Sequence, residues 1–162
     1  MTMTVKNFLL ISRPLRAGLL IFLLFFAFSS GFAKERENTF PPQAIIIASY
    51  RGDVNMVKKL LSAGIDKNTR DTLGATALHA AMFQSNLIVV QLLLDYGFDP
   101  NVRAEKNGNT PLHYAVSYNN VGAARLLMQY NANKNIKNFE GLTPLEKARK
   151  EKKENMVRLL YR

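Results

Sequence analysis

The sequence predicts an all-α solenoid of stacked helix–turn–helix units, mainly because one short motif recurs along the chain. It reads Thr-Pro-Leu-His at 110–113, Thr-Ala-Leu-His at 76–79 and Thr-Pro-Leu-Glu at 143–146, so the two intervals between threonines agree to within one residue. A glycine stands two residues before each threonine. An alanine follows five residues after each threonine, and twelve residues later comes a leucine, at Leu93, Leu127 and Leu160. The motif and the residues that flank it thus recur together with a period near 33, which is typical of a repeat architecture.

Each motif has the chemistry of a helix start followed by an apolar helix face. A threonine hydroxyl can accept a free backbone N–H, and proline at the first helical position lacks the N–H that would stay unpaired. Leu112, Ala115 and Val116 follow at the i, i+3, i+4 spacing of one helix face. A second apolar pattern begins at Ile88 and ends at Gly97, the usual place for a left-handed cap. Two short helices cannot bury their apolar faces alone, so neighbouring units must stack.

The stretch 1–33 differs from the rest of the chain and predicts a secretory signal peptide. Residues 1–16 carry three basic side chains and no acid, and residues 17–28 form an unbroken apolar run. Small residues then stand at positions 31 and 33, and charge begins at Lys34. A basic start, a short apolar centre and a small-residue exit together predict cleavage after Ala33.

The alternative is a leader that stays attached as an inner-membrane anchor. Twelve helical residues reach only ~18 Å, against about 30 Å of hydrocarbon, so cleavage is favoured. The chain has no cysteine, which excludes a lipid-modified lipoprotein and any disulfide framework. The part after Ala33 also lacks an Asn-x-Ser/Thr sequon. These two absences favour a bacterial periplasm as the location.

After the leader we expect a flexible spacer and then four repeats. The spacer is 34–43, and the repeat domain 44–162 divides into repeats at about 44–70, 71–103, 104–137 and 138–162. The first repeat lacks the threonine start and keeps Ala44, Ile47 and Ala48 as its inner face, as a degenerate terminal repeat would. In the second repeat Ala77 replaces proline and loses only the rigid start.

The third and fourth repeats each depart from the pattern in a way that predicts a local feature. One extra residue lies between Gly97 and Gly108, which we place within 102–105 and expect the turn to absorb. Asn131 replaces the capping glycine, a substitution that a left-handed conformation tolerates. Basic residues crowd 147–153, and this stretch predicts either the solvated face of a C-terminal cap, which is favoured, or a patch for lipid or an acidic partner.

The motif and its period resemble the ankyrin repeat, whose unit is a β-turn plus two helices. The resemblance implies a solenoid with β-turn or hairpin fingers, and target contacts from the turn tips and the exposed end of each first helix. It also implies that the motif histidines are structural and hydrogen-bond the turn and the motif threonine. The structural motif residues are then Thr76, His79, Thr110, Pro111, His113, Thr143 and Pro144.

No motif in the chain predicts an enzyme. His79 and His113 have no clustered carboxylates or cysteines at a spacing that would suit a metal or a general base. Neither a glycine-rich phosphate loop nor a Gly-x-Ser-x-Gly elbow is present. We therefore expect no cofactor, no metal and no catalytic activity.

The basic balance of the chain bears on its partners. The net charge is +10, and the part after Ala33 retains +7, from 19 Lys and Arg and 12 Asp and Glu. Such a balance raises the question of nucleic acid. Predicted export and the concentration of charge near the C-terminus argue against nucleic acid, and they favour an acidic protein or an anionic membrane surface.

The resemblance also marks the positions from which partner contacts are expected. On the first helices these are Tyr50, Arg51, Phe83, Gln84, Ser117, Tyr118, Lys150 and Glu151. On the turns they are Thr72, Leu73, Ala75, Lys106, Asn107, Asn109, Phe139, Glu140 and Leu142. Tyr50, Phe83 and Tyr118 lie on successive repeats, so we expect one aromatic stripe of the kind that anchors interfaces. The alternative, serious for Phe83, is that these rings only pack between repeats.

From these positions we predict a partner-binding set and a function. The set is Tyr50, Arg51, Leu73, Phe83, Gln84, Lys106, Asn107, Asn109, Tyr118 and Phe139. The protein is expected to be an exported, non-catalytic binding module, monomeric by itself, that holds another protein on the concave face of four ankyrin repeats. The alternatives are a periplasmic inhibitor or immunity protein for a toxin or enzyme, and a membrane-anchored assembly or protective factor. The fold alone does not name the target.

Overall fold

The computed structural model describes residues 40–161, which form eight helices in four pairs. In chain order these are α2 (Ala44–Arg51), α3 (Val54–Ser62), α4 (Ala77–Ala81), α5 (Leu87–Asp95), α6 (Pro111–Ser117), α7 (Val121–Gln129), α8 (Pro144–Lys150) and α9 (Glu154–Leu160). The predicted signal peptide and most of the predicted spacer lie outside the described residues. Within residues 40–161, no helix combines the length and apolar character needed to cross a bilayer.

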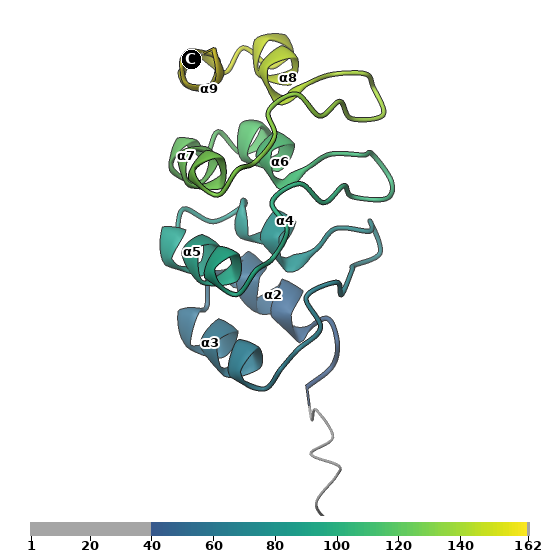
Figure 1. Cartoon of the computed structure of the whole chain (residues 1–162), viewed down its shortest axis with the longest axis vertical. Helices are drawn as coiled ribbons and strands as arrows, with labels where there is room; N and C mark the ends of the chain where they lie inside the picture. Colours follow the sequence, from purple (N-terminus) through teal and green to yellow (C-terminus); the bar gives the residue numbers. More distant parts are fainter. Residues whose placement is uncertain (1–39, 162) are drawn as a thin grey trace, which may run out of the picture. The chain divides into compact units, whose positions relative to one another are not determined.

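The four pairs stack so that the helices form two layers. The first helices α2, α4, α6 and α8 contact one another in sequence, and the second helices α3, α5, α7 and α9 do the same (Figure 1). The loops that join successive pairs project to one side as fingers (Figure 1). The described residues contain no β-strand, so the fingers are turns and not paired strands. The predicted α-helical solenoid is confirmed.

Two asparagines that begin second helices also join neighbouring pairs. Asn86 accepts the backbone N–H of Ile88 at 3.2 Å and donates to the Gly52 carbonyl at 3.1 Å. Asn120 accepts from Ala123 N at 3.0 Å and donates to the Gln84 carbonyl at 2.8 Å. Each side chain thus satisfies a free helix N–H and fixes the turn of the preceding pair.

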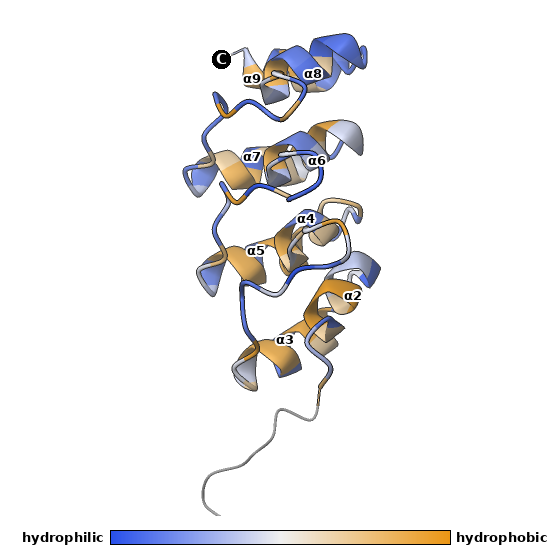
Figure 2. Ribbon diagram, turned by 90° about the vertical axis from the view of Figure 1, so that its right-hand side faces the viewer, coloured by the Kyte–Doolittle hydropathy of each residue, from blue (hydrophilic) through white to orange (hydrophobic). Residues whose placement is uncertain are grey.

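The hydrophobic core lies between the layers and between successive pairs. The predicted leucines Leu93, Leu127 and Leu160 are all buried. Hydropathy differs between the helices: α2 and α5 are largely apolar, whereas α8 is mostly hydrophilic (Figure 2). A polar outer helix on an apolar inner face is what a terminal capping repeat needs.

Two isoleucines of the apolar patterns lie at the surface: Ile47, which was predicted to belong to the inner face of the first repeat, and Ile88, which begins the second apolar pattern. Ile47 is 48% exposed, and Ile45 and Ala48 form the inner face of α2 at i, i+3 spacing. Ile88 is 59% exposed, because the buried side of α5 begins one residue later, at Val89. The prediction for Ile47 was wrong. Both isoleucines stand in apolar runs, where nearly every residue fits an inner face and the sequence cannot tell which side turns inward.

Candidate partner-binding groove

The motif histidines close each helix start and connect it to the next finger. Thr76 N donates to His79 Nδ1 at 3.1 Å, and His79 Nε2 lies 3.0 Å from the Asn109 carbonyl oxygen. His113 repeats the arrangement, with Thr110 N at 3.2 Å from Nδ1 and the Leu142 carbonyl oxygen at 2.9 Å from Nε2. These bonds are the contacts to the threonine and the turn that the resemblance implied.

The geometry determines the protonation state of His79. A backbone N–H can only donate, so Nδ1 accepts from Thr76 and the proton lies on Nε2, which donates to Asn109. Burial lowers the pKa of His79 from 6.5 to about 4, against the opposing effect of the Asn109 hydrogen bond. Burial likewise lowers the pKa of His113. Both imidazoles are therefore neutral at pH 7, with both nitrogens engaged.

The fourth repeat starts without a histidine. Glu146 takes its place and accepts from Thr143 N at 2.7 Å and from the Thr143 hydroxyl at 2.8 Å. These bonds hold the pKa of Glu146 below its usual value. Pro144, like Pro111, is buried at the first helical position. No group of three or more His, Cys, Asp or Glu side chains in residues 40–161 could ligate a metal.

Side-chain caps shape the fingers that flank the groove. Asp71 accepts from the backbone N–H groups of Leu73 and Ala75 at 2.8 and 2.9 Å, and Asn138 caps the last finger in the same way. Backbone bonds then join neighbouring fingers, from Lys106 N to the Leu73 carbonyl oxygen at 3.2 Å and from Phe139 N to the Asn107 carbonyl oxygen at 3.0 Å. The fingers form one hydrogen-bonded row.

The extra residue of the third repeat lies inside its finger. Ala104 N bonds the Asn109 carbonyl oxygen, five residues on, whereas Asp71 N and Asn138 N each bond a carbonyl four residues on. The added residue therefore falls after Ala104 and before Gly108. The turn absorbs the insertion, as expected. The predicted interval 102–105 overlaps the observed position of the added residue only at Glu105.

The finger residues of the predicted contact set divide into two kinds. Leu73, Lys106 and Phe139 are exposed, and Phe139 also lies under the Arg103 guanidinium, 4.9 Å from its ring centroid. Asn107 and Asn109 are half-buried and hold the turn: Asn107 Oδ1 accepts from Asn109 N, and Asn109 Oδ1 accepts from Asn138. The structure gives these two asparagines a structural role, and a contact role stays a prediction.

The three predicted aromatic residues form a continuous row. The Tyr50 and Phe83 rings stack with centroids 4.4 Å apart, and the Phe83 and Tyr118 rings meet edge to face at 5.1 Å. Their exposed fractions are 47%, 43% and 46%. The expected stripe is present as geometry, and its contact role stays a prediction. Counting from each motif threonine, however, Ser117 is the true equivalent of Tyr50 and Phe83, and Tyr118 lies one residue later at the end of α6.

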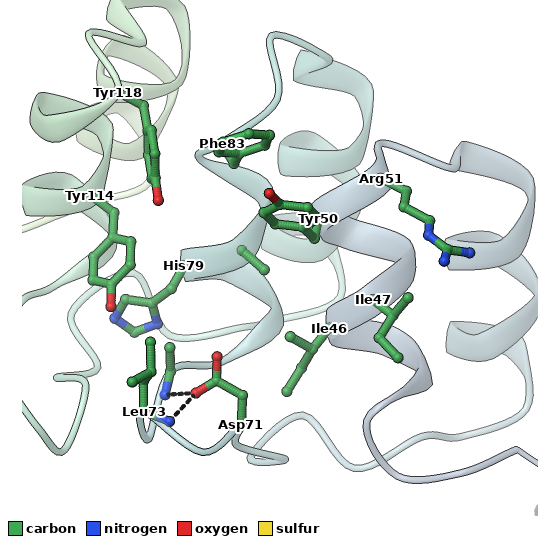
Figure 3. A pocket seen from close by; sticks show the side chains of 12 residues that line it. Ile46, Ile47, Tyr50, Arg51, Asp71, Leu73, His79, Phe83, Tyr114 and Tyr118 are labelled. Atoms are coloured by element: carbon green, nitrogen blue, oxygen red, sulfur yellow. Dashed lines mark hydrogen bonds between the residues drawn. The ribbon is translucent and has the colours of Figure 1, made fainter.

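The row borders a hollow of about 540 Å³ between the first helices and the fingers. Tyr50, Phe83 and Tyr118 lie along one side of it, and Leu73 lies at the finger end (Figure 3). The sequence analysis missed Tyr114, which also lines the hollow, with its ring 5.0 Å from His79. Tyr114 lies four residues after its motif threonine, and Ile47 stands at the same position of the first repeat. This helix position is exposed or half-buried in all four repeats, and that shared position was the signal available in the sequence.

Three of the polar groups that line the hollow are tyrosine hydroxyls. The hydroxyls of Tyr50, Tyr114 and Tyr118 have no hydrogen-bond partner within residues 40–161. Burial raises the pKa of the Tyr118 hydroxyl, and the neighbouring Tyr114 and Tyr50 raise it further. Phenol hydroxyls above aromatic rings can hold the backbone and apolar side chains of another molecule.

The remaining helix positions differ between the two ends of the stack. Arg51 is exposed and lines the hollow, whereas Gln84 is half-buried in the α4–α5 turn. At the other end, Lys150 pairs with Glu140 and Lys147 with Glu151, each at 2.6 Å. The groove is thus aromatic beside α2, α4 and α6 and charged beside α8.

Comparison with known proteins identifies the repeat. The family model described as ankyrin repeats (3 copies) matches the chain over residues 16–104, 45–138 and 90–162. A search of the curated proteins found no match. Ankyrin repeats generally mediate protein–protein interaction, and proteins built from them are typically non-catalytic.

Proposed function

Because the chain belongs to the ankyrin-repeat family, we propose that it is a non-catalytic module that binds another protein on the concave face of four repeats. This face consists of the first helices and the fingers, and it carries the aromatic hollow. The hydrogen bonds from His79 and His113 to neighbouring fingers support a binding role, because they hold the face in one shape before a partner arrives. A pre-organised surface loses little entropy on binding.

The observation that carries the proposal is the row Tyr50, Phe83 and Tyr118. Burial of large apolar side chains drives folding, yet these three rings remain more than two-fifths exposed while touching one another. Aromatic anchors near the centre of an interface supply much of its binding energy. The row therefore supports binding better than a purely structural role.

The proposal includes export, which rests on the sequence of the leader. A basic start, an apolar run over 17–28 and a small-residue exit support a protein that is released into the periplasm after cleavage at Ala33. N-terminal sequencing of the exported protein is expected to begin at Lys34. Recovery of the chain from the membrane with Met1 intact would instead support the membrane-anchored assembly or protective factor.

The experiment that tests the binding face compares two variants. Wild type and Tyr118→Ala are used as baits in a periplasmic extract, and the captured protein is then titrated against each. Truncation of a central aromatic anchor costs about 2 kcal/mol, some thirtyfold in affinity. The melting temperature should change little, because the Tyr118 ring is half-exposed. Equal affinity for both baits, or a melting temperature that falls as for a core variant, would refute the assignment.

A further inference from the structure

The aromatic hollow does not end at the concave face. Phe83 and Tyr118 also line a second hollow of about 310 Å³ beside the α4–α5 and α6–α7 turns. Leu87 and Gly122 then belong both to this second hollow and to a third, of about 600 Å³, between the second helices. The three hollows share lining residues, so they form one path, here called the belt, from the first-helix layer around the turns to the second-helix layer. The two larger hollows are mostly apolar, and the smaller hollow between them is more polar, because Ser85, Asn119 and Asn120 line it.

The outer part of the belt is a groove on α5 and α7. Leu87 and Ile88 are 40% and 59% exposed, and Leu92 and Leu126 line the same groove. Gly122 leaves space at the base of the groove because it has no side chain. A methyl group added there would lie 3.0 Å from Leu87 Cδ1. The turn beneath is held in place by Asn120, which bonds the carbonyls of Met82 and Gln84. The surface of the groove is mostly apolar.

Stacking of the repeats does not require an isoleucine at position 88. The equivalent residue is Asn55 in the first helix pair, Gly122 in the third and Asn155 in the fourth, counted at the same distance along each repeat. The other pairs thus place a polar or small residue where α5 exposes Ile88. An exposed apolar side chain at a position that folding leaves free marks a contact surface.

The charges along the belt are almost all positive. Arg51 lines the concave hollow, and Lys58 and Arg125 line the outer groove. None of the three takes part in an ion pair among residues 40–161. The one acidic lining residue, Asp71, uses its carboxylate to cap the finger turn. The belt therefore complements apolar side chains that are flanked by carboxylates.

We propose that the belt holds an extended segment of the partner protein, which carries apolar side chains with acidic residues beside them and wraps from the concave face onto α5 and α7, with its apolar side chains in the two larger hollows. This inference rests on the proposed function and gives the partner a chemical class. The belt follows two layers and the edge between them, so a flat membrane surface could cover only part of it. An extended chain can bend around the turns and fill all three hollows.

The test uses the full chain and a displayed random-peptide library as the probe. Enriched peptides should combine apolar residues with aspartate or glutamate. Their affinity is then measured by fluorescence anisotropy for wild type, Tyr118→Ala, Ile88→Asn and Tyr96→Ala. Ile88→Asn installs the residue that two other repeats use at this position, so the fold should persist, and a melting curve checks this. Tyr96→Ala is the matched control, an exposed aromatic on the same repeat that lines none of the three hollows.

The expected result is about a tenfold or greater loss of peptide affinity in both Ile88→Asn and Tyr118→Ala, with Tyr96→Ala unchanged. If only Tyr118→Ala weakens binding, the concave function stands and the belt is refuted. If neither variant weakens binding, both proposals fail. An empty selection or peptides without acidic residues would also overturn the inference. The same holds if Ile88→Asn abolishes self-association of the chain, or its binding to phosphatidylglycerol vesicles, instead of peptide binding.

Discussion

Acid should weaken the stack through His79, and the structure allows the effect to be calculated. The folded protein keeps this imidazole neutral because burial lowers its pKa to about 4, while the unfolded chain binds the proton with a pKa near 6.5. The nearby Arg70 lowers the pKa further, and Asp71 opposes it. Stability from the neutral ring is complete above pH 6.5 and is lost as the pH falls toward 4, since the unfolded state then binds more protons.

The size of the loss follows from the two pKa values. At pH 5 the linkage relation gives about 2 kcal/mol from this one residue, and roughly 3 kcal/mol once the pH is below both values. The hydrogen-bond geometry also predicts that protonation of His79 destabilises the folded protein. A proton on Nδ1 would face the Thr76 N–H at 3.1 Å, so protonation breaks the cap and leaves two donors opposed. His113 adds a change in the same direction, because burial lowers its pKa as well.

Urea unfolding followed by far-UV circular dichroism between pH 7 and pH 5 measures the effect, since the chain has no tryptophan for fluorescence. The midpoint for wild type should fall by about 1 M or more. In His79→Gln the amide can accept from Thr76 and donate to Asn109 without titrating, so this variant should start less stable but lose about 2 kcal/mol less on acidification. Equal losses in the two proteins would refute the assignment of a buried neutral His79.

Four further substitutions test the packing of the stack by thermal or urea unfolding. Leu93→Ala should cost about 2–5 kcal/mol, because it leaves a cavity at a fully buried site; a loss below about 1 kcal/mol would contradict the core assignment. Gly74→Ala should cost more than Gly141→Ala, since both have positive φ but only at Gly74 would the new Cβ meet Glu105 Cβ, at 2.3 Å. Asn120→Ala should cost about 2 kcal/mol through its lost cap and inter-repeat bonds, and an unchanged midpoint would count against that role.

Local chemistry explains why much of the fold could be predicted. Threonine followed by proline or alanine marks a helix start, and the positive φ angles of Gly97 and Asn131, 78° and 62°, show that the predicted caps are left-handed. These signals act over a few residues, so they can be read directly along the chain. The nearly constant spacing of the motif threonines then predicts that the units are alike and stack.

The inner face of an apolar helix was predicted less well. In α2 three isoleucines follow one another, and α5 is apolar on most sides, so the pattern of hydrophobic residues left the orientation open. The neighbouring repeat decided it by packing against Ile45 and Val89. The same choice exposed Ile47 and Ile88, which now line the concave hollow and the outer groove.

By itself, the sequence determined the repeat, its helix starts and caps, and the candidate row of aromatic residues. Only the tertiary structure decided that Tyr118, one residue out of frame, reaches Phe83, and that Tyr114 joins the same hollow. The physical reason is that side chains more than thirty residues apart meet through the rotation and offset between stacked units. Those two quantities depend on packing across the whole interface, and no local spacing in the chain encodes them.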